Sequence, residues 1–136
     1  MTFDTKIAVL LREDLQTWQR LNVTAFLVSG ITAAFPQLVG EPYVDADGTR
    51  YLAMLGQPVM VMQGDAALMR TAHERCLRRD LEVSLFTADL FRTGNDDDNR
   101  AAVAAVATAD LDVVGLGVHA PRNAVDKVLK GATLHH

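Results

Sequence analysis

An unbroken apolar run near the N-terminus constrains the fold most. Residues 7–11 read IAVLL, between Lys6 and Arg12. Successive side chains of a strand point to opposite faces of its sheet, so a run without polar residues needs cover on both faces. Strands of this kind are typical of α/β folds, in which helices lie on both sides of a sheet. The run therefore predicts a central strand of an α/β domain.

The size and charge of the chain limit what the domain can do. With 136 residues, of which 49% are hydrophobic and 22% charged, the chain has the composition of one globular domain spanning residues 1–136. This composition excludes disordered and fibrous proteins. The formal net charge of −4 has the wrong sign for holding a nucleic-acid backbone unless basic residues gather locally.

The only cysteine and the N-terminus bear on the compartment. Cys76 has no second cysteine to pair with, which excludes an internal disulfide and suits a reducing environment. Residues 1–6 lack the basic and apolar segments of a signal peptide. The longest apolar window, residues 25–35, is interrupted by Ser29 and Thr32 and is too short to cross a bilayer. We therefore expect a cytoplasmic protein without membrane contact.

The rest of the chain alternates between strand and helix patterns. Apolar residues three or four positions apart predict a long helix with its N-cap at Thr17 and its end before Pro36. Further strands are predicted at residues 57–62, 81–87 and 111–118, and further helices at 65–80, 100–107 and 122–130. Strands alternating with helices predict a three-layer α/β domain.

Turn-forming residues interrupt this alternation once. Asp45, Asp47 and Gly48 lie between short apolar stretches and predict a β-hairpin inserted at residues 43–52. A calcium loop is the alternative, but its glycine would stand at the sixth position and its last ligand would be glutamate rather than Gly56. Asp96 to Asp98 could also clasp a metal, but a solvated acidic segment at a helix start explains them. We predict no metal site and no cofactor.

Two segments carry candidate site residues at the ends of strands. Asp89, Arg92 and Thr93 follow the third predicted strand, where α/β sheets commonly present side chains to ligands. Asp89 could act as a base or position a substrate. Alternatively, Asp89 and Arg92 form an ion pair in a loop. Residues 115–121 are predicted to join the fourth strand to the last helix, either as an anion-binding loop that includes His119 or as a tight turn.

A polar residue within the first helix is a third candidate. Asn22 stands among apolar neighbours, so its amide could orient a substrate. The alternative is a buried amide whose hydrogen bonds are satisfied by the backbone.

In combination, these segments resemble the type II peptidyl-tRNA hydrolase superfamily over nearly the whole chain. The matching stretches are KIAVLLREDL (6–15), LNVTAFLVSG (21–30), DLFRT (89–93) and VVGLGVHAPRNAVDKVLKGATL (113–134). WQRLNVTAFL (18–27) with YVDADGTRYLAMLGQPVMV (43–61) is similar to an uncharacterised bacterial family of this fold that adds the hairpin. The resemblance implies a three-layer α/β/α sandwich with a mixed, mostly parallel four-stranded sheet, and a homodimer.

The resemblance also implies site residues. Asp89 and Thr93, with Asn22 at the place of the family's catalytic lysine, are the catalytic candidates. A second set consists of ligand-binding candidates: Arg92, Gly117, His119 and Ser29, the last at the place of a family histidine. An asparagine cannot supply the positive charge that a lysine offers an oxyanion, which is commonly worth several kcal/mol of barrier.

Three functions follow as hypotheses. The first is a relative of the hydrolases that binds a small ligand or peptide in the equivalent cleft without cleaving peptidyl-tRNA. The second is a peptidyl- or aminoacyl-tRNA hydrolase in which Arg12 or Arg20 replaces the lysine. The third is a non-catalytic dimeric interaction module that uses the hairpin as its contact.

Overall fold

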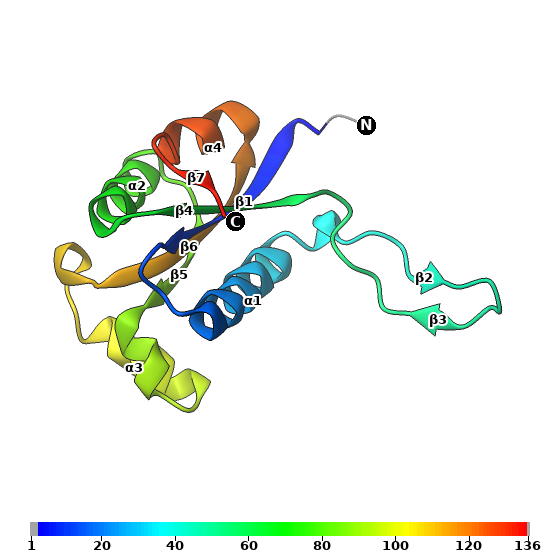
Figure 1. Cartoon of the computed structure of the whole chain (residues 1–136), viewed down its shortest axis with the longest axis horizontal. Helices are drawn as coiled ribbons and strands as arrows, with labels where there is room; N and C mark the ends of the chain where they lie inside the picture. The colour runs from blue at the N-terminus through cyan, green and yellow to red at the C-terminus, as the bar shows by residue number, and fades with distance from the viewer. Residues whose placement is uncertain (1–2, 136) are drawn as a thin grey trace.

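The computed structural model describes residues 3–135 and has a mixed α/β fold (Figure 1). Its main sheet has five strands in the order β5-β6-β1-β4-β7, and β2 with β3 forms a separate hairpin. The strands are β1 (Thr5–Arg12), β2 (Tyr43–Val44), β3 (Arg50–Tyr51), β4 (Val59–Gly64), β5 (Val83–Thr87), β6 (Val113–Pro121) and β7 (Thr133–Leu134). The α-helices are α1 (Thr17–Ala34), α2 (Ala66–Arg78), α3 (Asp96–Ala104) and α4 (Arg122–Val128), and η1 (Pro36–Leu38), η2 (Ala88–Arg92) and η3 (Thr108–Asp110) are 3₁₀ turns.

The apolar run of β1 lies at the centre of the sheet, as predicted. Ala8 and Leu10 belong to one hydrophobic core, together with side chains of α2 and α4. Val9 and Leu11 belong to a second core, which includes Val23 of α1. Alternate side chains of one strand thus serve two cores, and helices pack on both faces of the sheet (Figure 1).

Local signals set the ends of the helices. α1 ends before Pro36 as predicted, but it begins after Gln16 rather than with Thr17 as its cap. The backbone N–H of Gln16 donates to the side chain of Gln19 at 2.9 Å, an interaction that the search for a Ser, Thr, Asp or Asn cap overlooks. Asp65 caps α2 by accepting a hydrogen bond from the Leu68 N–H at 2.8 Å.

The prediction of a mostly parallel, four-stranded sheet is wrong. Of the neighbouring strand pairs in this sheet, β1–β4 is parallel, whereas β1–β6, β5–β6 and β4–β7 are antiparallel. The fifth strand is β7, a short edge strand near the C-terminus. A strand buried on both faces has the same apolar pattern whichever way its neighbours run, so direction could not be inferred from that pattern.

The prediction of a loop at residues 115–121 is also wrong. Strand β6 continues through Gly115 and Gly117 to Pro121. A Cβ atom at Gly115 would stand 2.6 Å from Cγ1 of Val23, and one at Gly117 would stand 3.0 Å from Cδ1 of Ile31. These glycines therefore let α1 pack closely on the sheet; they do not form a turn.

The predicted hairpin is present and projects from the body of the fold (Figure 1). The Asp45 carboxylate closes its turn by accepting hydrogen bonds from the N–H groups of Asp47 and Thr49 at 3.0 Å and from the Tyr51 hydroxyl at 2.7 Å. The bond from Tyr51 is the main cause that lowers the pKa of Asp45. Asp45 therefore builds a turn and is not part of a calcium loop.

Among the helices of residues 3–135, none combines the length and the hydropathy that crossing a bilayer requires.

Candidate functional site

Two adjoining cavities lie between α1, β5, η2 and α3. Their volumes are about 280 Å³ and about 540 Å³, and they share five lining residues, so they form one continuous depression. Its volume is in the range of small-molecule sites. We call it the α1–α3 groove; it is lined by Trp18, Asn22, Phe26, Leu27, Ser84, Leu85, Phe86, Leu90, Phe91, Thr93, Gly94, Asn95, Asp96, Asn99, Arg100, Val103 and Ala104.

Four aromatic rings form one wall of the groove. Ring centroids lie 5.7 Å apart for Trp18 and Phe91, 5.1 Å for Phe91 and Phe86, and 5.9 Å for Phe86 and Phe26. Trp18 is 56% and Phe26 54% exposed, although both are large apolar side chains. Exposed aromatic surface inside a concave site is available to an apolar ligand group.

Asn22 and Thr93 line the same part of the groove, although 71 positions separate them (93 − 22). Asn22 is exposed, so the alternative of a buried, satisfied amide is wrong for it. The Thr93 hydroxyl donates to the Leu90 carbonyl oxygen at 3.0 Å and also contacts the side-chain amide of Asn99. A hydroxyl has one proton, and Thr93 donates it to Leu90. The contact with Asn99 is then a hydrogen bond in which the amide nitrogen of Asn99 donates to the threonine oxygen.

The polar rim of the groove is close to neutral. Asn95 caps α3 by accepting a hydrogen bond from the Asp98 N–H at 2.8 Å. Arg100, the only cation among the groove residues, pairs with Asp96 and with Asp97. The groove therefore offers amide, hydroxyl and aromatic groups rather than a field that would attract a phosphate backbone.

Asp89 and Arg92 lie on η2 beside the groove but do not line it. Their side chains are 44% and 80% exposed and form an ion pair with 3.9 Å between Oδ1 and Nη1. The alternative of a loop ion pair therefore describes their geometry. An exposed pair of this kind contributes little to stability.

None of the other three sequence candidates lines the α1–α3 groove. Ser29 is exposed on α1 and its hydroxyl donates to the Phe26 carbonyl oxygen at 2.6 Å. Gly117 is inside β6, opposite Val9 of β1, and His119 is two residues farther along, opposite Ile7. The seven candidates therefore do not form one site.

His119 packs its ring against the edge of Phe35, with centroids 4.6 Å apart. Within residues 3–135, both ring nitrogens are buried without a hydrogen-bond partner. Burial lowers the pKa of His119, because the charged imidazolium loses hydration there. His119 is thus a packed side chain in the neutral form.

The lowered pKa of His119 predicts that the protein loses stability in acid. Because its folded-state pKa lies below the unfolded value, its stabilising effect is present above about pH 6.5 and is lost as the pH falls. We expect His119→Phe, which keeps the ring contact, to reduce the difference in unfolding free energy between pH 7.5 and pH 5. Urea titrations of both proteins at the two pH values measure this difference. An equal difference in both proteins would contradict the assignment.

The two arginines that could replace a catalytic lysine are engaged elsewhere. Arg12 pairs with Asp14 and Asp112, each at 2.7 Å. Arg20 contacts the Glu13 carbonyl oxygen and lies 3.3 Å from the ring of His135. Neither arginine lines the α1–α3 groove.

Other reactive groups also lie apart from the groove. Burial raises the pKa of the Cys76 thiol to about 11, so it is protonated at neutral pH. In residues 3–135, no three His, Cys, Asp or Glu side chains gather in a way that could hold a metal ion.

Sequence reasoning missed most of the groove residues. Asn95 stands directly before α3, where an asparagine is a capping signal, but nothing in the sequence near Asn95 and Asn99 indicates a groove. Phe86 lies on β5 and Phe91 on η2, which follows it. That both rings line a groove depends on the position of α1, which the sequence does not reveal.

Comparison with known proteins identifies the family but not an activity. The model of a family described as "Protein of unknown function (DUF2000)" matches residues 5–136. A solved structure of a protein of unknown function from Agrobacterium tumefaciens strain C58 is 47% identical, with a TM-score of 0.97, and the match covers 99% of this chain and 100% of that one. No curated protein matches the chain. The family match over almost the entire length shows that this chain belongs to the DUF2000 family.

Proposed function

We propose that this protein binds a small apolar ligand or a peptide in the α1–α3 groove and does not hydrolyse peptidyl-tRNA. The observation that carries the proposal is the composition of the groove: an aromatic wall faces a rim of asparagine and threonine side chains. Sites of this kind hold an apolar group by burial and orient it through a few polar contacts. Asn22 and Asn99 could donate to and accept from a peptide bond.

We also infer that the scaffold is a three-layer α/β/α sandwich related to type II peptidyl-tRNA hydrolases, in a cytoplasmic protein. Helices on both faces of the sheet and the segments matching that superfamily support this inference. Asn22 would then stand where those enzymes place a lysine. Arg12 and Arg20 are engaged elsewhere, and the one cation of the groove, Arg100, is paired with Asp96 and Asp97, so no unpaired cation of the groove replaces that lysine. This favours binding over the rearranged hydrolase.

A titration with blocked dipeptides that carry two apolar side chains tests the binding proposal. We expect the Trp18 indole N–H and the Asn22 and Asn99 side-chain amides to shift in ¹H–¹⁵N NMR spectra. Phe26→Ala should weaken binding about tenfold, because burying a large apolar side chain is worth roughly 1.5–3 kcal/mol. Asn22→Ala should weaken it by a smaller factor, in keeping with one hydrogen bond.

Asn123→Ala is the matched control, since Asn123 is an exposed asparagine on α4 outside the groove. It should leave the affinity unchanged. The proposal fails if no groove resonance moves with any dipeptide, or if Phe26→Ala binds as tightly as the wild type. Cleavage of peptidyl-tRNA by the purified wild type at the rate of a true hydrolase would establish the rival function instead.

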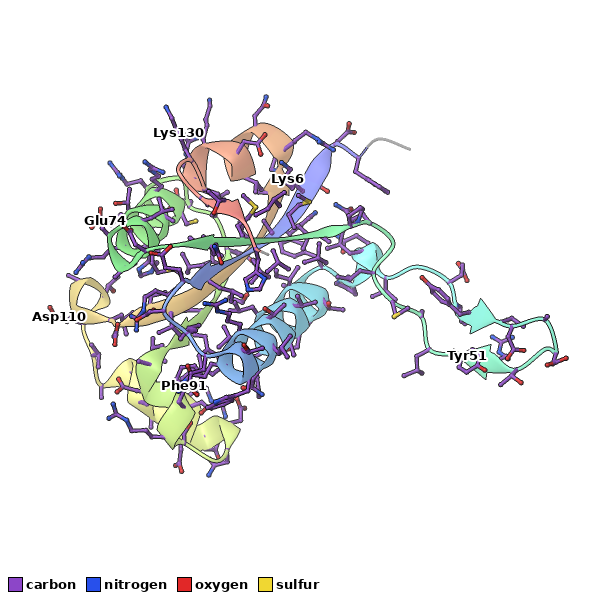
Figure 2. All side chains as sticks on the ribbon, viewed as in Figure 1. Lys6, Tyr51, Glu74, Phe91, Asp110 and Lys130 are labelled. Atoms are coloured by element: carbon purple, nitrogen blue, oxygen red, sulfur yellow. The ribbon has the colours of Figure 1, made fainter. Side chains whose placement is uncertain are left out.

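A second proposal concerns the hairpin: we propose that it joins two copies of this chain into a homodimer. Tyr43, Val44, Tyr51 and Leu52 are all more than half exposed on it, and Figure 2 shows Tyr51 far from the body of the fold. A two-stranded hairpin is at best marginally stable by itself in water. Apolar side chains on a projecting arm are therefore best explained by burial against a partner.

A further inference from the structure

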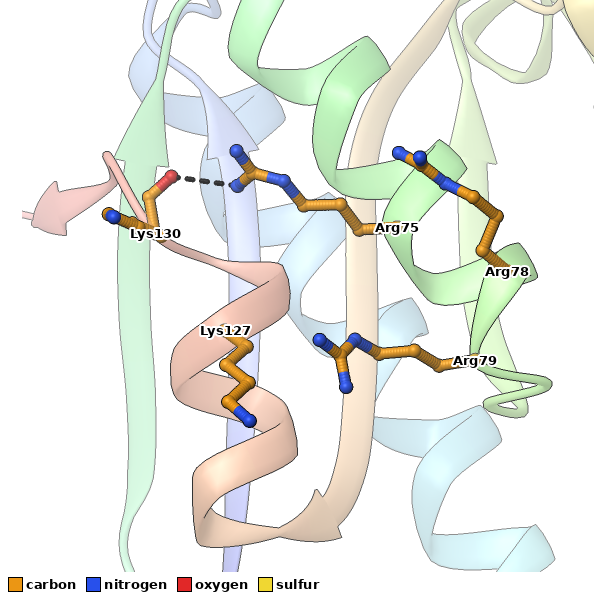
Figure 3. A pocket seen from close by; sticks show the side chains of 5 residues that line it. All are labelled: Arg75, Arg78, Arg79, Lys127 and Lys130. Atoms are coloured by element: carbon orange, nitrogen blue, oxygen red, sulfur yellow. Dashed lines mark hydrogen bonds between the residues drawn. The ribbon is translucent and has the colours of Figure 1, made fainter.

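A second cavity, remote from the α1–α3 groove, is lined entirely by cations. It lies between the C-terminal part of α2 and α4 and has a volume of about 440 Å³ (Figure 3). We call it the basic pocket; it is lined by Arg75, Arg78, Arg79, Lys127 and Lys130. Lys130 and Phe91, a groove residue, lie on opposite sides of the sheet in Figure 2. The basic pocket is therefore separate from the proposed peptide site.

No carboxylate neutralises the basic pocket. Among the ion pairs of residues 3–135, none includes any of its five side chains. Asp126 stands four positions before Lys130 on the same segment, but its carboxylate binds Lys6 at 2.6 Å. Glu74 stands four positions before Arg78, a spacing that suits an ion pair, yet they form none within 4.0 Å.

One of the five side chains positions the others. Arg75 donates a hydrogen bond to the Lys130 carbonyl oxygen at 2.9 Å and so connects α2 to the end of α4 (Figure 3). Arg79 also reaches from α2 toward α4 (Figure 3). The remaining four residues line the same cavity, and Arg75 connects the two segments that carry them.

Helix dipoles explain only part of this arrangement. Basic residues are favoured in the last turn of a helix, and both α2 and α4 end at the basic pocket. However, like charges three or four positions apart on a helix repel each other, and Arg75 has such neighbours in Arg78 and Arg79. The chain has 17 acidic residues, yet within residues 3–135 none of them forms an ion pair with a cation of the basic pocket. Five unneutralised cations around one cavity are instead the arrangement expected of an anion site.

We propose that the basic pocket binds the linked phosphate groups of a small molecule. Arginine guanidinium groups fit phosphate oxygens in a bidentate manner, and lysines add point charges. Five cations exceed the charge of a single phosphate, so two or more linked phosphates are favoured. No aromatic side chain lines the pocket, so the phosphates rather than a stacked base would be recognised. Nucleotides and inorganic oligophosphates both carry this chemistry.

Calorimetric titration of the full chain with tripolyphosphate tests the proposal. We expect binding at about 50 mM salt that weakens by about 200 mM, because salt screens the attraction between exposed charges. Arg79→Gln combined with Lys127→Gln should weaken binding about tenfold or more. Arg50→Gln combined with Arg70→Gln removes the same charge outside the basic pocket and should change the affinity less than about twofold. Thermal melts of both variants establish that they fold.

Three further ligands test which class of phosphate compound binds to the basic pocket. Orthophosphate should bind at least about tenfold more weakly than tripolyphosphate, because it meets fewer of the cations. ATP binding more tightly than tripolyphosphate would assign the site to nucleotides, and equal affinities would assign it to oligophosphate alone. The proposal is overturned if tripolyphosphate does not bind at low salt or if both double variants weaken it equally. It is also overturned if the Arg79 and Lys127 double variant weakens the binding of a short oligoribonucleotide but not that of tripolyphosphate or ATP.

Discussion

Replacing Gly115 by valine is expected to lower the unfolding free energy by about 3 kcal/mol. A Cβ atom at this position of β6 would meet Cγ1 of Val23 at 2.6 Å and Cδ1 of Leu27 at 3.0 Å. Both partners are fully buried in the core beneath α1, so they have little room to move. Overpacking a dense core typically costs about 1–3 kcal/mol, which is a large part of a total stability of roughly 5–15 kcal/mol. Urea denaturation followed by circular dichroism measures the loss.

Gly94→Val is the matched control for this substitution. A Cβ atom at Gly94 would have no neighbour within 4 Å, so we expect a change within about 0.5 kcal/mol. If Gly115 stood in a solvent-facing loop, the two substitutions would have similar effects. Equal stability of both variants would therefore contradict the close approach of α1 to β6.

If the proposed homodimer forms through the hairpin, removing the hairpin is expected to give a monomer without unfolding the domain. The Gly40 N–H donates to the Met54 carbonyl oxygen at 2.8 Å, so the chain can be closed there by a two-residue Asn-Gly turn in place of residues 41–53. The residues from Glu41 to Leu52 are exposed, and their loss should leave the thermal midpoint nearly unchanged. Light scattering of both proteins measures the change in mass.

Serine substitutions test whether apolar side chains of the hairpin form the contact while the hairpin itself is kept. Tyr43→Ser combined with Leu52→Ser removes apolar surface from the hairpin and should also weaken association. Leu77→Ser removes a 45% exposed leucine from α2 and should not. A wild type that is monomeric at all concentrations, or a shortened protein that remains dimeric, would refute the role proposed for the hairpin.

Predictions based on short-range patterns were confirmed more often than those that depend on distant contacts. Asp45 closes its turn and residues 7–11 form a buried central strand, because each signal acts within a few residues. The resemblance placed Asn22 and Thr93 in one site, and the packing of α1 on β5 and β6 brings them to one groove.

Other site predictions depended on an incorrect assignment of local structure. The predicted binding loop at residues 115–121 requires the strand to end before His119, yet Gly117 and His119 both lie within β6. The glycines serve the contact with α1, which no pattern within residues 113–121 reveals. Asp89 and Arg92 follow β5, the third strand predicted from the sequence. The 3₁₀ turn η2 that contains them keeps both side chains beside the groove.

The sequence by itself determined the elements that local chemistry specifies: a central strand covered on both faces, helices with defined ends, and an inserted hairpin. Only the tertiary structure decided the strand directions, the fifth strand, the α1–α3 groove and the basic pocket. The physical reason is that side chains alternate across a strand in the same way in parallel and antiparallel sheets. The aromatic groove and the basic pocket arise in turn from residues on different elements, which only folding brings together.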